Sequence, residues 1–172
     1  TSQPGVKPFF FPPAENSALP EECRIASDRI VDLTSKLGPD GRLVWDVPAG
    51  DWTILRFGRV ITGHTTRPAP EPGLGFESDK FDAAAIEVHL SAYAAKLLDF
   101  VEPLGYRKSG LTTLHFDSWE MSSQNWSEKF RADFQRLRGY DPLPFLPAMT
   151  GLIVDGGETS ERFLWDLRRT AQ

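Results

Sequence analysis

The stretch LTTLHFDSWEMSSQNW (residues 111–126) decides the predicted fold, because an apolar strand pattern runs directly into acidic, amide and indole side chains. Within it, Leu114 and Phe116 fall on one face of a strand, and His115 and Asp117 fall on the other. In barrels of alternating strands and helices, active sites are built from the residues that follow the C-terminal ends of strands. The stretch therefore predicts a strand with a functional site immediately after it.

A helix is predicted before this strand, over residues 82–101. Asp82 is the predicted N-cap, and an apolar stripe follows at helical spacing. The stripe consists of Ile86, Leu90, Tyr93, Leu97 and Val101. This periodicity indicates one long helix with a single buried face.

Two further helices are predicted after the strand. The first has Ser127 as its N-cap and Gly139 as its C-terminal stop. Its apolar stripe consists of Phe130, Phe134 and Leu137. A short strand at 152–154 then precedes a third helix at 160–170.

The N-terminal part of the chain has a different pattern. Residues 1–24 are rich in proline and predict an extended arm. β-branched and aromatic residues predominate at 25–62, with a hairpin predicted around the turn Gly38-Pro39-Asp40-Gly41. Closely spaced prolines exclude regular structure from the loop at 63–80, and a loop of this length is usually functional or disordered.

The alternation of strands and helices predicts an α/β fold with a parallel sheet. Both a (β/α)8 barrel and a doubly wound sheet satisfy the pattern, but no glycine-rich phosphate turn follows any predicted strand, which disfavours a nucleotide-binding fold. From the pattern alone both folds stay open; with the family resemblance described below, the predicted fold is part of a (β/α)8 barrel preceded by a β-rich segment. Its domains are the arm at 1–24, the β-rich segment at 25–52 and the partial barrel at 53–172.

Composition narrows the class of protein. The chain has 172 residues, of which 40% are hydrophobic and 25% charged, as in soluble globular proteins. A net charge of −5 with mixed signs disfavours nucleic acid as a partner, and no apolar run is long enough to predict a membrane span. The three histidines show no zinc-ligand spacing, and the single Cys23 leaves the redox compartment open.

The acids beside indoles after the strand suit carbohydrate chemistry, because sugars stack their C–H faces on aromatic rings. Glycosidic bond cleavage needs one carboxylic acid that stays protonated, and an apolar neighbour such as Trp119 favours the neutral form of Glu120. Glu120 is therefore the candidate acid. The alternatives are that Glu120 and Asp117 cap turns or lie in solvent, and that Trp119 and Trp126 are core residues.

Several long runs resemble the bacterial α-L-rhamnosidases of glycoside hydrolase family 106. The resemblance extends from about Ile30 to the end of the chain. The runs are VWDVPAGDWTILRFG (44–58), GLGFESDK (73–80), HFDSWEMSSQNW (115–126), FRADFQRLRGYDPLPFLPAMTG (130–151) and SERFLWDLRRT (160–170). Their order and spacing make the resemblance more specific than any short motif.

The resemblance implies a large multidomain enzyme that hydrolyses terminal α-L-rhamnose from a glycan with inversion. It implies a catalytic (β/α)8 barrel with β-sandwich modules, calcium near the active site, no organic cofactor, and export to the periplasm or outside the cell. Glu120 takes the role of general acid. The residues implied to line the sugar subsite are Asp117, Trp119, Gln124, Asn125, Glu77, Asp79 and Lys80.

An inverting mechanism also needs a second carboxylate, about 6.5–9.5 Å from the first. Asp155, Glu158 and Glu161 match no motif for this base, which is expected in a part of the enzyme beyond Gln172. The chain alone is then expected to bind sugar weakly and to hydrolyse nothing. Two other readings stay open: a non-catalytic carbohydrate-binding module that stacks sugars on its tryptophans, and a scaffold domain whose acids only cap turns.

Overall fold

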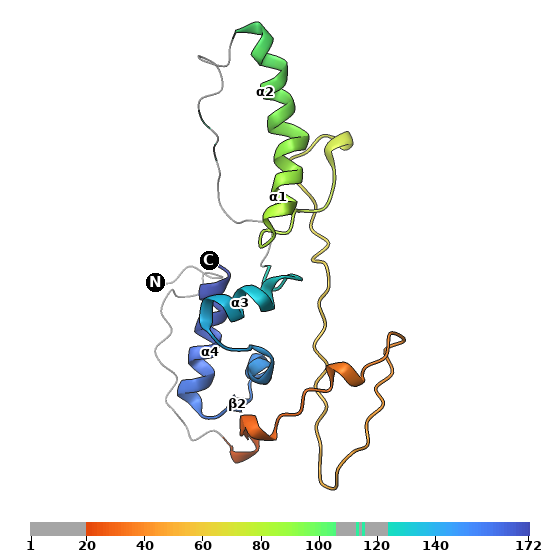
Figure 1. Cartoon of the computed structure of the whole chain (residues 1–172), viewed down its shortest axis with the longest axis vertical. Coiled ribbons are helices and arrows are strands. Elements are labelled where there is room, and N and C mark those ends of the chain that lie inside the picture. Colours follow the sequence, from red (N-terminus) through yellow and green to blue (C-terminus); the bar gives the residue numbers. More distant parts are fainter. Residues whose placement is uncertain (1–19, 106–112, 114, 116–123) are drawn as a thin grey trace, which may run out of the picture. The chain divides into compact units, whose positions relative to one another are not determined.

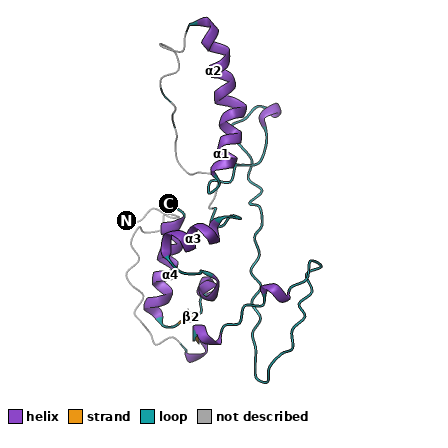
Figure 2. Cartoon of the chain, in the orientation of Figure 1, coloured by secondary structure: helices purple, strands orange, loops and turns teal. Residues whose placement is uncertain are grey.

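The computed structural model of the chain describes residues 20–105, 113, 115 and 124–172. The chain divides into two compact units. One consists of Thr1–Gly50 and Pro142–Trp165, and the other of Asp51–Asp141 and Asp166–Gln172. Within the described residues the structure consists of helices and loops with two strands of two residues each, and the helices are evident in Figure 2. None of the described helices has the length and hydropathy of a membrane span.

The first unit contains a parallel pair of strands, β1 (Arg24–Ile25) and β2 (Ile153–Val154), in which Ile25 lies opposite Val154. Asp155 follows β2 with a positive φ of 53°, and its N–H donates to the Ile25 carbonyl at 3.0 Å. The chain then turns into α4 (Gly157–Thr170), as Figure 1 shows. The strand predicted at 152–154 and the third predicted helix are both confirmed.

The core of the first unit forms between β2, the first turns of α4 and the 3-10 segment Leu143–Thr150. Val154 and Phe163 are fully buried, and the Phe145 and Phe163 rings lie 5.7 Å apart. The Ser160 hydroxyl accepts from the Val154 N–H at 2.8 Å and donates to the Val154 carbonyl at 3.1 Å. The strand and the helix after it are therefore joined by both packing and hydrogen bonds.

The N-terminal β prediction is largely wrong. The predicted turn exists, because Leu37 and Leu43 form one antiparallel bridge and the Gly38 N–H donates to the Arg42 carbonyl at 2.8 Å. The flanking strands do not form: a 3-10 turn occupies Thr34–Lys36, and residues 44–62 have no regular structure. β propensity describes packing on a sheet, but residues 44–62 form no strand here, and the Val60 side chain among them is 85% exposed.

The second unit contains the long predicted helix, which is confirmed. It consists of α1 (Ala83–Leu90), a π-helical segment at Ser91–Ala95 and α2 (Lys96–Val101) (Figure 1). Asp82 is the N-cap as predicted, since its side chain accepts from the Ala84 N–H at 3.1 Å.

The predicted buried stripe of this helix is only partly correct. Tyr93 is 68% exposed and Leu97 is 41% exposed, and no residue of α1, α2 or the π segment is fully buried. The half-buried positions after Leu90 are Ala94, Leu98 and Val101. A π-helical turn inserts an extra residue into the helical repeat and so shifts which later side chains share a face.

The second helix is confirmed as α3 (Phe130–Arg138). Phe130 and Phe134 are buried as predicted, whereas Leu137 is 47% exposed. Gly139 ends the helix with φ 82°, and its N–H donates to the Gln135 carbonyl at 2.9 Å. The prediction of Ser127 as N-cap is wrong, because the helix begins three residues later and no described group bonds the Ser127 hydroxyl.

The end of α3 is tied to the last residues of α4 within the second unit. The Arg138 Nε donates to the Thr170 hydroxyl at 3.0 Å, and the Tyr140 hydroxyl donates to Asp166 at 3.0 Å. The strand predicted at 111–117 falls outside the described residues except for Thr113 and His115, which are both exposed. The predicted domain boundaries stay predictions.

Candidate functional site

The loop that carries Glu77, Asp79 and Lys80 folds back on its own beginning. Thr65 and Phe76 form an antiparallel bridge, and the Glu77 N–H donates to the His64 carbonyl at 3.0 Å. The closely spaced prolines lie within the loop, where a 3-10 turn at Glu71–Gly73 reverses the chain. The long loop is therefore an ordered element that brings residues 77–80 to the start of α1.

Asp79 stabilises the turn into α1. Its Oδ1 accepts from the Phe81 N–H at 2.9 Å, and its carbonyl accepts from the Asp82 N–H at 3.2 Å. An aspartate that bonds the backbone two residues further on forms an Asx turn. The Asp79 carboxylate is thus held in a defined position by the local chain, directly before the helix N-cap.

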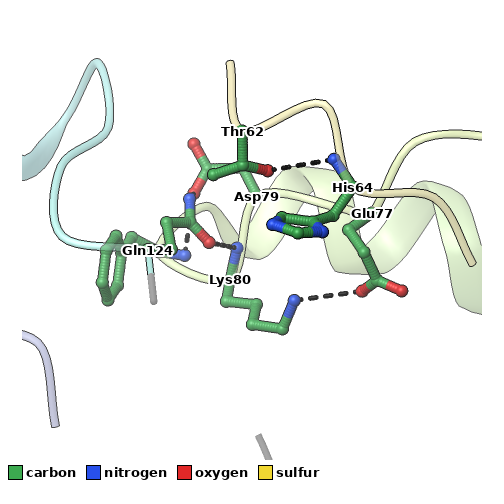
Figure 3. Close-up of polar contacts among 7 residues, drawn as sticks. Thr62, His64, Glu77, Asp79, Lys80 and Gln124 are labelled. Carbon is green, nitrogen blue, oxygen red and sulfur yellow. Dashed lines mark hydrogen bonds and ion pairs between the residues drawn. The ribbon is translucent and has the colours of Figure 1, made fainter. Parts of the chain in front are cut away.

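Gln124 contacts this turn from a distant part of the chain. Its Oε1 accepts from the Lys80 N–H at 3.0 Å, and its Nε2 donates to Asp79 Oδ1 at 2.5 Å. Figure 3 shows the Gln124 carboxamide pointing at both partners. Both ends of the amide are therefore used, and 44 residues of sequence separate Gln124 from Lys80.

Lys80 forms an ion pair with Glu77 within the same loop. The Lys80 Nζ lies 3.0 Å from Glu77 Oε2, and both side chains are about three-quarters buried (Figure 3). The pair is shielded from water more than a surface pair, which reduces the screening of its charges. The contact directs the long Lys80 side chain away from Gln124 and toward Glu77.

A second link joins the same two segments at Asp82 and Lys129. The Lys129 ammonium donates to Asp82 Oδ1 at 2.7 Å. This hydrogen bond, followed by that from the Ala84 N–H, lowers the pKa of Asp82 below its ordinary value. The bond to Asp82 in turn raises the pKa of Lys129, so each partner favours the charged form of the other.

Aromatic rings make a third link. The ring of Phe130 lies 5.4 Å from that of Phe81 and 4.9 Å from that of Trp126. Trp126 is partly buried in this cluster. Trp126 therefore packs against a buried ring of α3 without being fully buried itself.

Four of the eight predicted site residues therefore come together: Glu77, Asp79, Lys80 and Gln124. Asn125 is exposed beside them, and Asp117, Trp119 and Glu120 lie outside the described residues. Sequence reasoning missed the contact between Asp82 and Lys129 and the packing of Phe81 on Phe130. No local pattern could have found them, because each joins residues more than forty positions apart.

The described residues do not by themselves form a metal centre. No group of three acidic, histidine or cysteine side chains gathers among them. The Glu77 carboxylate accepts from the Lys80 ammonium, and Asp79 accepts from the Gln124 amide and the Phe81 N–H. These two carboxylates therefore do not fit a calcium site in the described part of the chain, and calcium stays a prediction without assigned ligands.

Comparison with known proteins identifies the family. The model of the alpha-L-rhamnosidase family, glycoside hydrolase family 106, matches residues 11–172. The chain belongs to this family. The family resemblance seen in the sequence is confirmed, and the family is one of glycoside hydrolases.

Two relatives extend the comparison. The solved structure of a rhamnosidase from Novosphingobium sp. PP1Y is 38% identical, with a TM-score of 0.68 over 84% of this chain and 14% of that one. A protein of Formosa agariphila with the provisional name of beta-glucuronidase is 39% identical over 158 residues, 91% of this chain and 13% of the relative. The chain thus spans about one-seventh of the length of the relatives it matches.

Proposed function

We propose that the chain is part of a longer glycoside hydrolase that releases terminal α-L-rhamnose from a glycan or glycoside. The observation that carries the proposal is the match of nearly the whole chain to the rhamnosidase family, together with a rhamnosidase structure 38% identical to it. The four assembled polar residues support it, because Gln124 follows the run DSWE by only a few positions.

In the proposed reaction, Glu120 donates its proton to the glycosidic oxygen as the bond from that oxygen to the anomeric carbon breaks. Water attacks the anomeric carbon from the opposite face, and a carboxylate base outside this chain accepts the proton of the water. The products are rhamnose of inverted anomeric configuration and the free alcohol. The proposal assigns to Trp119, the apolar neighbour of Glu120 in the sequence, the role of favouring the protonated form of this acid.

The sugar subsite is proposed to be built from Asp117, Trp119, Gln124 and Asn125, with Glu77, Asp79 and Lys80 from the preceding loop, either as sugar contacts or as residues that support those contacts. We propose that these residues lie at the mouth of a (β/α)8 barrel. The parallel pair β1–β2, followed directly by α4, supports this arrangement, because strand, helix and parallel pairing are its repeating unit. Calcium near the active site belongs to the same proposal.

A beta-glucuronidase is the second candidate, favoured by the provisional name of the Formosa agariphila relative. Assays of the full-length enzyme with an aryl α-L-rhamnoside and an aryl β-D-glucuronide separate the two. We expect rhamnose to be released, first as the β-anomer when the reaction is followed by NMR. Cleavage of the glucuronide alone would replace the proposal with the second candidate, and a pure carbohydrate-binding module would cleave neither.

A further inference from the structure

We infer that Asp79 and Gln124 are positioning residues, which hold the chain after Glu120 on the loop before α1 instead of contacting the sugar directly. The inference rests on the proposed function, in which Glu120 is the general acid. It makes the role of two subsite residues more specific. The Gln124 carboxamide donates to the Asp79 carboxylate and accepts from the Lys80 N–H. We call these two hydrogen bonds the clamp.

Both polar ends of the Gln124 side chain are occupied within the clamp. The carbonyl oxygen accepts from the Lys80 N–H at 3.0 Å, and the nitrogen donates to Asp79 at 2.5 Å. Asp79 is itself tied to the Phe81 N–H at 2.9 Å. Because Gln124 and Asp79 are partly buried, breaking these bonds would leave their polar atoms with little access to water. The arrangement suits holding the chain better than binding a ligand.

Two other links fix the same pair of segments. Lys129 bonds Asp82 at 2.7 Å, and the Phe81 and Phe130 rings lie 5.4 Å apart. Residues 79–82 are thus joined to residues 124–130 at three separate points: the clamp, the bond between Lys129 and Asp82, and the ring contact. The direction in which the chain approaches α3 is therefore determined from Gln124 onward, and the clamp is the link nearest to the run DSWE.

Covalent geometry connects the clamp to Glu120. Gln124 follows Glu120 by four positions, so their Cα atoms lie within about 14 Å of each other at roughly 3.6 Å per residue. A displacement of Gln124 therefore changes where the chain carrying Glu120 is anchored. A misplacement of about 1 Å at a reacting group costs on the order of 100-fold in rate.

The test compares leaving groups in the full-length enzyme. Departure of a poor leaving group needs a proton from the general acid, whereas departure of nitrophenolate does not. With Gln124→Ala, kcat for an alkyl or disaccharide α-L-rhamnoside should fall about 10- to 100-fold while that for the nitrophenyl rhamnoside changes little. KM should stay within about twofold for both substrates, since no sugar contact is removed.

A double variant tests whether the clamp acts through Glu120. If it does, Gln124→Ala adds almost no further loss once Glu120→Gln is present. An additive loss would overturn the inference, as would a raised KM with unchanged kcat. If Glu120→Gln alone has no effect, the proposed function fails; if Glu120→Gln is inactive but Gln124→Ala is normal, only the inference about the clamp fails.

A second pair of variants keeps the test decisive if Gln124→Ala does not fold. Gln124→Glu places a carboxylate against Asp79 and should reduce kcat in the same selective way, because like charges repel. Adding Asp79→Asn removes the repulsion and should restore much of the activity; no recovery would overturn the inference. Glu128→Gln is the matched control, since it removes a surface bond to Arg59 from the same segment and should leave kcat unchanged.

Discussion

At the scale of single residues, the described part of the site is held together by side chains that bond one another. Glu77 pairs with Lys80, and Asp79 pairs with Gln124. Such reciprocal contacts hold each side chain in a defined orientation. Asp82 is held in the same way, because its carboxylate caps α1 and also binds Lys129.

The bond between Asp82 and Lys129 predicts a dependence of stability on pH. The pKa of Asp82 is lowered in the folded chain, so its stabilising effect is present above the ordinary carboxyl value of about 3.9 and is lost as pH falls through the folded value. The pKa of Lys129 is raised, so its effect is present below the ordinary value of about 10.4 and is lost as pH rises through the folded value.

Lys129→Met should therefore lower the melting temperature slightly near neutral pH, because the Lys129 side chain is 60% exposed and water screens its charge. The difference from the native protein should shrink as pH falls from the ordinary carboxyl value of about 3.9 through the lowered pKa of folded Asp82. Melting curves of both proteins at several pH values measure this. Lys96→Met, an exposed lysine on α2, is the control, and a deficit of the same size at pH 3 and pH 7 would rule out the assignment.

At the scale of elements, the helices could be predicted and the strands mostly could not. Helix signals are local: Asp82 caps the start of α1, and Gly139 supplies the left-handed conformation that ends α3. A strand forms only when it pairs with another strand, and the local sequence does not identify that second strand. The apolar pattern at 52–62 therefore predicts a strand, but these residues form none in the structure.

The helix α3 allows a direct comparison of buried and exposed apolar residues. Phe134 is fully buried with its ring edge-on to Tyr140, whereas Leu137 on the same helix is 47% exposed. Phe134→Ala should cost about 3–5 kcal/mol in the free energy of unfolding, because it leaves a cavity where a large ring was packed. Leu137→Ala should cost much less in the same urea unfolding experiment. Equal costs would show that the packing of α3 differs from that described.

The candidate site was predictable in its residue types and only partly in its arrangement. The resemblance to the rhamnosidase family predicts Glu77, Asp79, Lys80 and Gln124 as site residues. The structure brings these four together. Which atoms bond which could not be read from the sequence, because the two segments meet only through the tertiary fold. The π-helical segment at Ser91–Ala95 could not be predicted either, because the apolar pattern there has the spacing of a regular α-helix.

At the scale of the whole molecule, the chain is a member of the alpha-L-rhamnosidase family that spans about one-seventh of its relatives' length. Hydrolysis by inversion needs two carboxylates on opposite sides of the anomeric carbon, and this chain supplies a candidate for only one. In the proposal, this chain contributes the general acid Glu120 and the residues proposed to position it.

The most direct test of this account is the rate at which the full-length enzyme with Glu120→Gln hydrolyses an unactivated α-L-rhamnoside. Removal of the general acid should lower kcat by about 100- to 10,000-fold, while calorimetry shows that the sugar still binds. Glu128→Gln, eight residues further along the chain, should retain the native rate. Native activity in the Glu120→Gln enzyme would contradict the assignment of the acid and, with it, the mechanism proposed for this chain.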